Sequence, residues 1–200
     1  MQSRLAGYLL LLCGVAGCDL AATRGPLPEP EVPAMNLPRP LREWNWGGGS
    51  CVHASTVMNM RWQGQYDLAA KWRRTYAGGE TSSGLRQKLE TNGVDYACTV
   101  EGDLQFLEWA SRTRRGAVIF FYTAHSIDFC GFHMRDGREY AVLLDNNRID
   151  NFIWVPKEQF VPEWRGYGGF ALTPLFRPQP RRSYDPFIFG AVPCLMCRIG

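Results

Sequence analysis

Residues 45–62 read NWGGGSCVHASTVMNMRW, a glycine-rich stretch followed by a helical pattern. Within it, apolar side chains recur at the spacing of one helix face, at Ala54, Val57, Met58 and Trp62. Three consecutive glycines before this pattern are typical of a tight loop that ends where a helix starts, so we predict a central helix that begins at Cys51. Backbone N–H groups and the positive end of the dipole lower the pKa of a thiol at a helix N-terminus. Cys51 is therefore a candidate nucleophile.

The rest of the chain shows helical patterns first and strand patterns mostly afterwards. Further helices are predicted at 65–76, 83–90, 103–112 and 156–164. Strands are predicted at 96–100, 117–122, 126–132, 140–144, 152–155 and 169–172. This order indicates an α+β domain with a mainly antiparallel sheet. Asp136-Gly137, between two of the strands, favours a tight hairpin turn.

Two further residues complete a candidate catalytic set with Cys51. His125 precedes the predicted strand 126–132, and Asp145 ends the next strand, across the Asp-Gly turn. Adjacent antiparallel strands can place the two side chains together, so that the carboxylate orients the imidazole. The register of these two strands favours Asp145 as the residue that faces His125. Asn146 and Asn147 are alternatives, because a shift of one residue reverses which side chain faces inward.

In this order, the residues resemble the papain-like cysteine peptidases. That superfamily has an amide side chain upstream of a cysteine that begins a central helix, a histidine that opens a strand ending in a Gly–aromatic pair, and Asn or Asp at the end of the next strand. Here Asn45 precedes Cys51 by six positions, the strand after His125 contains the pair 131–132, and Asp145 ends the next strand. Aspartate as third residue, and a histidine only 74 positions after the cysteine, resemble the compact branch that contains bacterial double-glycine leader peptidases.

The resemblance implies a hydrolase that cleaves amide bonds in a peptide or protein substrate and needs no cofactor or metal. Cys51, His125 and Asp145 would form the triad, with a thioester acyl-enzyme as intermediate. The Asn45 side chain and the Cys51 backbone N–H would stabilise the oxyanion. Trp46, beside this site, is a candidate for lining a substrate groove. The alternatives are an amidase or acyltransferase with the same triad, and a non-catalytic binding lipoprotein with the same fold.

The N-terminal residues resemble a bacterial lipoprotein signal. One arginine and a short apolar run precede the small residues and cysteine of Val15-Ala16-Gly17-Cys18, so we predict a signal peptide at 1–17 and lipidation of Cys18. A proline-rich spacer is expected at 18–40, the peptidase-like domain at 41–176 and an extended tail at 177–200. These predictions place the domain in the cell envelope, on the extracytoplasmic side of either membrane, anchored by lipid.

Composition agrees with one globular domain and gives little support for nucleic-acid binding. Of 200 residues, 46% are hydrophobic and 20% charged, and the net charge is only +3. The oligomeric state is not indicated.

Of the seven cysteines, four have no role in export, anchoring or chemistry, namely Cys98, Cys130, Cys194 and Cys197. In an oxidising compartment a local Cys194–Cys197 disulfide, with Cys98–Cys130 as a second one, is the plainer expectation, and an unpaired buried set is the alternative that the sequence leaves open. The lone Cys-x-x-Cys lacks the second ligand pair of a metal site.

Overall fold

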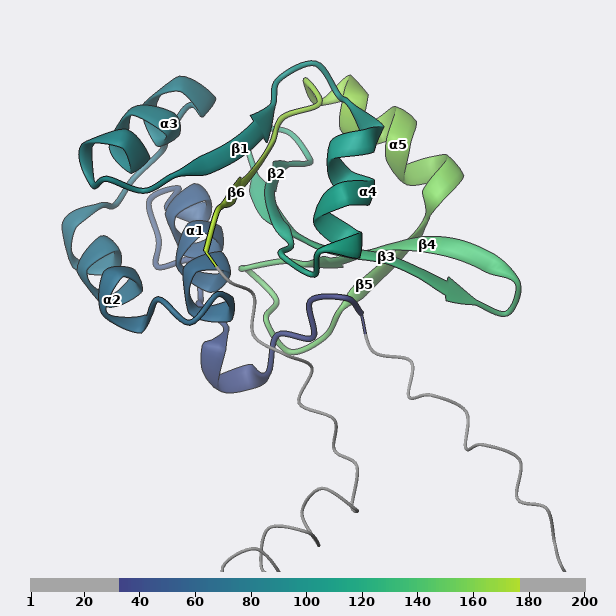
Figure 1. The fold of residues 1–200 in the computed structure, drawn as a ribbon, viewed down its shortest axis with the longest axis horizontal. Coiled ribbons are helices and arrows are strands. Elements are labelled where there is room, and N and C mark those ends of the chain that lie inside the picture. The colour runs from purple at the N-terminus through teal and green to yellow at the C-terminus, as the bar shows by residue number, and fades with distance from the viewer. Residues whose placement is uncertain (1–32, 177–200) are drawn as a thin grey trace, which may run out of the picture. The chain divides into compact units, whose positions relative to one another are not determined.

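The structure, a computed structural model, describes residues 33–176, and each predicted helix and strand has a counterpart in it (Figure 1). The helices are η1 (Arg39–Leu41), α1 (Cys51–Trp62), α2 (Tyr66–Thr75), α3 (Ser82–Thr91), α4 (Leu104–Arg112) and α5 (Lys157–Gly166). The strands are β1 (Tyr96–Thr99), β2 (Ala117–Phe120), β3 (Ser126–Arg135), β4 (Arg138–Leu144), β5 (Ile153–Pro156) and β6 (Ala171–Pro174). The short 3-10 helix η1 was not predicted.

The six strands form one antiparallel sheet in the order β1-β6-β2-β3-β4-β5. One core layer joins α1, α2 and α3 to the sheet through residues such as Val57, Trp72 and Leu85. A second layer contains residues of α4 and α5, including Leu107 and Trp164. The α+β class and the central N-terminal helix on an antiparallel sheet are confirmed.

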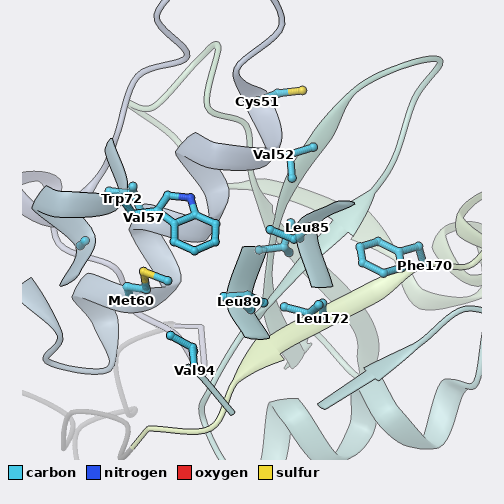
Figure 2. Packing of buried hydrophobic residues seen from close by; sticks show 12 residues of the cluster. Cys51, Val52, Val57, Met60, Trp72, Leu85, Leu89, Val94, Phe170 and Leu172 are labelled. Carbon is cyan, nitrogen blue, oxygen red and sulfur yellow. The ribbon is translucent and has the colours of Figure 1, made fainter. Parts of the chain in front are cut away.

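Helix α1 is enclosed on almost every side. Every residue from Cys51 to Met60 is buried, polar and apolar alike, which is the pattern of a helix in the middle of a core. Figure 2 shows Val57 and Met60 of α1 near Trp72, with Cys51 at the end of this cluster beyond Val52. Packing therefore fixes the helix that carries the candidate nucleophile, and the cysteine lies at its edge.

The predicted Asp-Gly turn connects β3 and β4. Arg135 pairs with Arg138, so that the connection has two residues, and both have positive φ, +49° at Asp136 and +76° at Gly137. This is the geometry that a tight hairpin with the right-handed strand twist requires. The turn sets the register that brings the far ends of β3 and β4, next to His125 and Asp145, to the same edge of the sheet.

The packed domain starts earlier than the predicted boundary at Leu41. Met35 and Leu37 are fully buried, and the Met35 N–H donates to the Cys130 carbonyl oxygen at 2.7 Å. A bulge in β3 between Phe129 and Gly131 breaks the ladder at this carbonyl. Residues 33–40 were predicted as spacer because of their prolines; in the structure their apolar side chains pack against the sheet.

Gly131→Ala is expected to destabilise the protein by about 3 kcal/mol, because it combines overpacking with an unfavourable backbone conformation. Its φ is +118°, and a Cβ atom there would lie 2.6 Å from the Ala34 Cβ atom. The control is Gly137→Ala, at φ +76° with nothing within 4 Å of the new atom, which should lose only about 1 kcal/mol. Chemical denaturation measures both free energies of unfolding, and equal losses would contradict the tight docking of residues 33–37.

Of the two alternatives for Cys98 and Cys130, the disulfide is wrong and the unpaired set is what the structure shows. Cys98 lies on β1 and Cys130 on β3, with β6 and β2 between them. Three strand spacings of about 4.8 Å each exceed the Cα separation that a disulfide can bridge. Both are free thiols. Cys194 and Cys197 lie outside the described residues, as does Cys18. Within residues 33–176, no helix is long and apolar enough to cross a membrane.

Candidate active site

The loop before Cys51 has a backbone that only glycine adopts readily. Gly47, Gly48 and Gly49 have φ values of +51°, +62° and +80°. Ser50 ties this loop to the one between α2 and α3, because its hydroxyl accepts the Gly78 N–H at 3.0 Å. The loop delivers Cys51 as the first residue of α1, with the thiol 3.6 Å from the Gly49 carbonyl oxygen. The glycine run is thus required by the turn that aims the thiol.

His125 ends the short connection between β2 and β3. Tyr122 and Ala124 in this connection have positive φ, +65° and +53°, which is unfavourable for residues with side chains. The Phe121 N–H donates to the His125 carbonyl oxygen at 3.1 Å and closes the turn. Strained backbone of this kind persists where the surroundings hold it, commonly at functional sites. Here it presents the imidazole at the sheet edge next to the start of α1.

Asp145 is the residue that the structure places against His125. The His125 Nε2 atom lies 2.9 Å from the Asp145 Oδ1 atom, and both side chains are largely buried. The Asn147 backbone N–H donates to the same carboxylate oxygen at 2.8 Å. The Asn147 side-chain nitrogen is farther from the imidazole, at 3.4 Å, and Asn146 faces the interior. Of the three alternatives for the third position, Asp145 makes the short contact.

The Cys51 thiol is linked to His125 electrostatically, because the imidazole is the strongest influence that lowers the pKa of the thiol. Because Nε2 faces Asp145, Nδ1 is the ring nitrogen left for the thiol. Burial acts to raise the pKa of Cys51, but the bond to His125 and the Ser126 backbone outweigh it, so that the pKa lies below its ordinary value. The bonds to Asp145 and then Cys51 raise the pKa of His125 to about 9. These directions favour an ionised Cys51 beside a protonated His125 over the neutral pair.

The carboxylate of Asp145 remains ionised beside this pair. Burial alone would raise its pKa, yet the bond to His125 and the backbone N–H of Asn147 hold the pKa below its usual value. An ionised carboxylate at Nε2 both orients the ring and stabilises its positive charge. The three groups can therefore act as nucleophile, base and orienting residue, the chemistry of acyl transfer.

Asn45 lies beside this set, although its side chain has a partner of its own. Its Nδ2 atom donates to the Asn147 Oδ1 atom at 3.0 Å, and its backbone N–H donates to the Asn146 carbonyl oxygen at 2.8 Å. Its own Oδ1 atom is buried without a partner. To bind an oxyanion, the Asn45 Nδ2 group would have to share or give up its hydrogen bond to Asn147. The structure thus joins Asn45 to the loop after Asp145, which the sequence did not indicate.

Trp46 is exposed, with 69% of its surface accessible. Its indole N–H donates to the Glu43 carboxylate at 3.0 Å. Glu43 also forms ion pairs with Arg61 at 2.8 Å and Arg73 at 2.9 Å, so the ring is tethered at one edge and open at the other. Trp46 is therefore available to a ligand rather than part of the core.

His53 does not join the candidate site. It is buried at 1% exposure and stacks on Tyr76, with ring centroids 5.7 Å apart. Burial, then Lys88 and Arg73, lower its pKa to about 4, so that it stays neutral. Among the described residues, no group of three or more His, Cys, Asp or Glu side chains could hold a metal ion.

A cysteine at the N-terminus of a central helix, packed on an antiparallel sheet that carries histidine and aspartate, is the architecture of the papain-like cysteine peptidase fold. The structure is similar to the crystal structure of the peptidase domain of Streptococcus ComA, a bi-functional ABC transporter involved in a quorum-sensing pathway. The TM-score is 0.50 at 16% identity, over 68% of this chain and 97% of that one. No protein-family model and no curated protein matches the sequence. The predicted fold is confirmed by this likeness.

Proposed function

We propose that the protein is a cysteine peptidase that cleaves amide bonds with Cys51, His125 and Asp145. The observation that carries the proposal is the 2.9 Å bond between His125 and Asp145, together with a Cys51 thiol whose pKa is lowered by the same imidazole. The likeness to a peptidase domain supports a peptide or protein substrate. An amidase would form the same kind of acyl-enzyme from an amide outside a peptide chain, and an acyltransferase would pass the acyl group to an acceptor other than water.

The proposed reaction has two steps. The Cys51 thiolate attacks the carbonyl carbon, and the oxyanion is stabilised by the Cys51 backbone N–H and the Asn45 side-chain amide. The C–N bond then breaks, the His125 imidazolium donates its proton to the leaving amine, and a thioester remains on Cys51. In the second step, neutral His125 takes a proton from water, the hydroxide attacks the thioester, and the carboxylic acid leaves. Cys51 departs as thiolate beside protonated His125, and the cycle closes.

The location of the enzyme is also a proposal. Lipidation of Cys18 would anchor the chain to a membrane of the cell envelope, with the domain on the extracytoplasmic side. The supporting observation is the Val15-Ala16-Gly17-Cys18 motif after an apolar run. Such a location would give the site access to envelope peptides and to peptidoglycan.

Selective alkylation of the full-length protein tests whether Cys51 is activated, as an enzyme requires and a binding lipoprotein does not. At pH 6, iodoacetamide should modify Cys51 at least about tenfold faster than Cys98, because only thiolates react and the pKa of Cys51 is lowered. Cys98 is the internal control, since it is a free thiol and more exposed than Cys51. Peptide mass spectrometry resolves the two sites. A Cys51 that reacts no faster than Cys98 would contradict the proposed function.

A further inference from the structure

The Asn146 side chain, which the reaction above does not use, lies fully buried behind the candidate site. Its Nδ2 atom is 2.8 Å from the Ser126 carbonyl oxygen, 3.0 Å from the Cys51 carbonyl oxygen and 3.0 Å from the Ser55 hydroxyl. An amide nitrogen has two hydrogens, so that these three acceptors use its whole donor capacity. A buried amide with every donor engaged is costly to disturb.

These contacts join the three parts of the chain that carry the reacting groups. The peptide bond attaches Asn146 to Asp145, one acceptor is the main chain of Cys51 itself, and another is the main chain of Ser126, next to His125. The Asn146 carbonyl oxygen also accepts the Asn45 backbone N–H at 2.8 Å. One residue thus touches the backbone at or beside each candidate catalytic residue.

A second set of buried polar groups extends the contact along α1. Ser55 accepts from Asn146, while Asn59 donates to the carboxyl group of Asp128 on β3. Ser55 and Asn59 are four residues apart and therefore lie on one face of α1. Burial raises the pKa of Asp128 well above its ordinary value. The Asn59–Asp128 contact holds the middle of α1 to β3, away from the Cys51 and Ser126 backbone that Asn146 binds.

We infer that Asn146 is a positioning residue, whose buried amide holds the start of α1 against the ends of β3 and β4 so that Cys51 reaches His125. The inference rests on the proposed function and assigns a role to a residue that touches none of the reacting atoms. It predicts that loss of the amide weakens the Cys51–His125 bond, which lets burial raise the pKa of Cys51.

The test is the pH profile of Cys51 alkylation in full-length Asn146→Ala, followed by site-resolved mass spectrometry. The midpoint should rise by about one pH unit, and the rate at pH 6 should fall about tenfold, because a smaller fraction of the cysteine is thiolate. Asn146→Ser keeps one donor and should fall between the wild type and the alanine variant. Should Asn146→Ala fail to fold, the serine variant decides by the same measurement.

Asn59→Ala is the matched control. It removes another fully buried amide, on α1, which donates to the Ser55 carbonyl oxygen and to Asp128 but not to the backbone of Cys51 or Ser126. It should lower stability and leave the alkylation midpoint of Cys51 unchanged. An unchanged midpoint in the folded Asn146 variants, or an equal shift in Asn59→Ala, overturns the inference. A wild-type Cys51 that titrates as an ordinary thiol overturns the proposed function instead, and the positioning role with it.

Discussion

Cys51→Ala is expected to abolish peptide cleavage, with a loss of at least about 10⁴-fold, as for other enzymes that lose a nucleophile. The thioester can form only at this sulfur, because among the described residues no other cysteine side chain contacts His125. The measurement is incubation of the full-length protein with peptides from envelope proteins and with peptidoglycan fragments, wild type beside variant. Mass spectrometry then identifies products that only the wild type releases.

The control for this comparison is Cys98→Ala. Cys98 lies on the edge strand β1, with β6 and β2 between it and the strand that follows His125, so its removal should leave cleavage unchanged. Products that persist in Cys51→Ala would contradict the assignment of the nucleophile. A small amine added as a second acceptor distinguishes the related reactions, since an acyltransferase would form a new amide with it and a peptidase would release the free acid.

Much of the fold could be predicted because local patterns agree with the tertiary structure. Helix α1 begins at Cys51 and ends at Trp62 as the sequence indicates, since its glycine loop and apolar spacing act within a few residues. The Asp136-Gly137 turn is equally local and is confirmed by the pairing of Arg135 with Arg138. From that turn, counting residues along two antiparallel strands was enough to bring His125 and Asp145 to one edge.

What the sequence could not provide depends on contacts between distant segments. The bulge at Gly131 frees a carbonyl oxygen for Met35, and no local pattern in a proline-rich stretch indicates that this methionine is buried. Nor did strand patterns give the sheet order, which separates Cys98 from Cys130 by two strands. The role of Asn146 depends on three acceptors from three segments. The only sequence signal for it was the pair Asn146-Asn147 directly after Asp145. Both residues were interpreted only as alternatives to Asp145 for the third catalytic residue.

His125→Ala is expected to slow alkylation of Cys51 at pH 7 by about 100-fold, because the thiolate loses the partner that lowers its pKa. Without the imidazole, burial is opposed only by the backbone hydrogen bonds of Ser126 and Val52, so that less thiolate exists at neutral pH. The control is His133→Ala, near the other end of β3, where the ring packs against Trp154. That variant should alkylate like the wild type. Equal rates in His125→Ala and the wild type would show that the thiol is activated without His125.

The same pair sets the pH range of cleavage. The pKa of Cys51 is lowered, so the thiolate is present on the alkaline side of that pKa, whereas His125 holds its proton up to about pH 9. Cleavage should therefore rise as Cys51 ionises, at lower pH than an ordinary thiol would, and fall near pH 9, where His125 can no longer protonate the leaving amine. Asp145→Asn should move this alkaline limit to lower pH, because the bond to Asp145 is the largest cause of the raised pKa of His125. An alkaline limit that is the same in Asp145→Asn and the wild type would mean that another group holds the imidazolium, and that Asp145 only orients the ring.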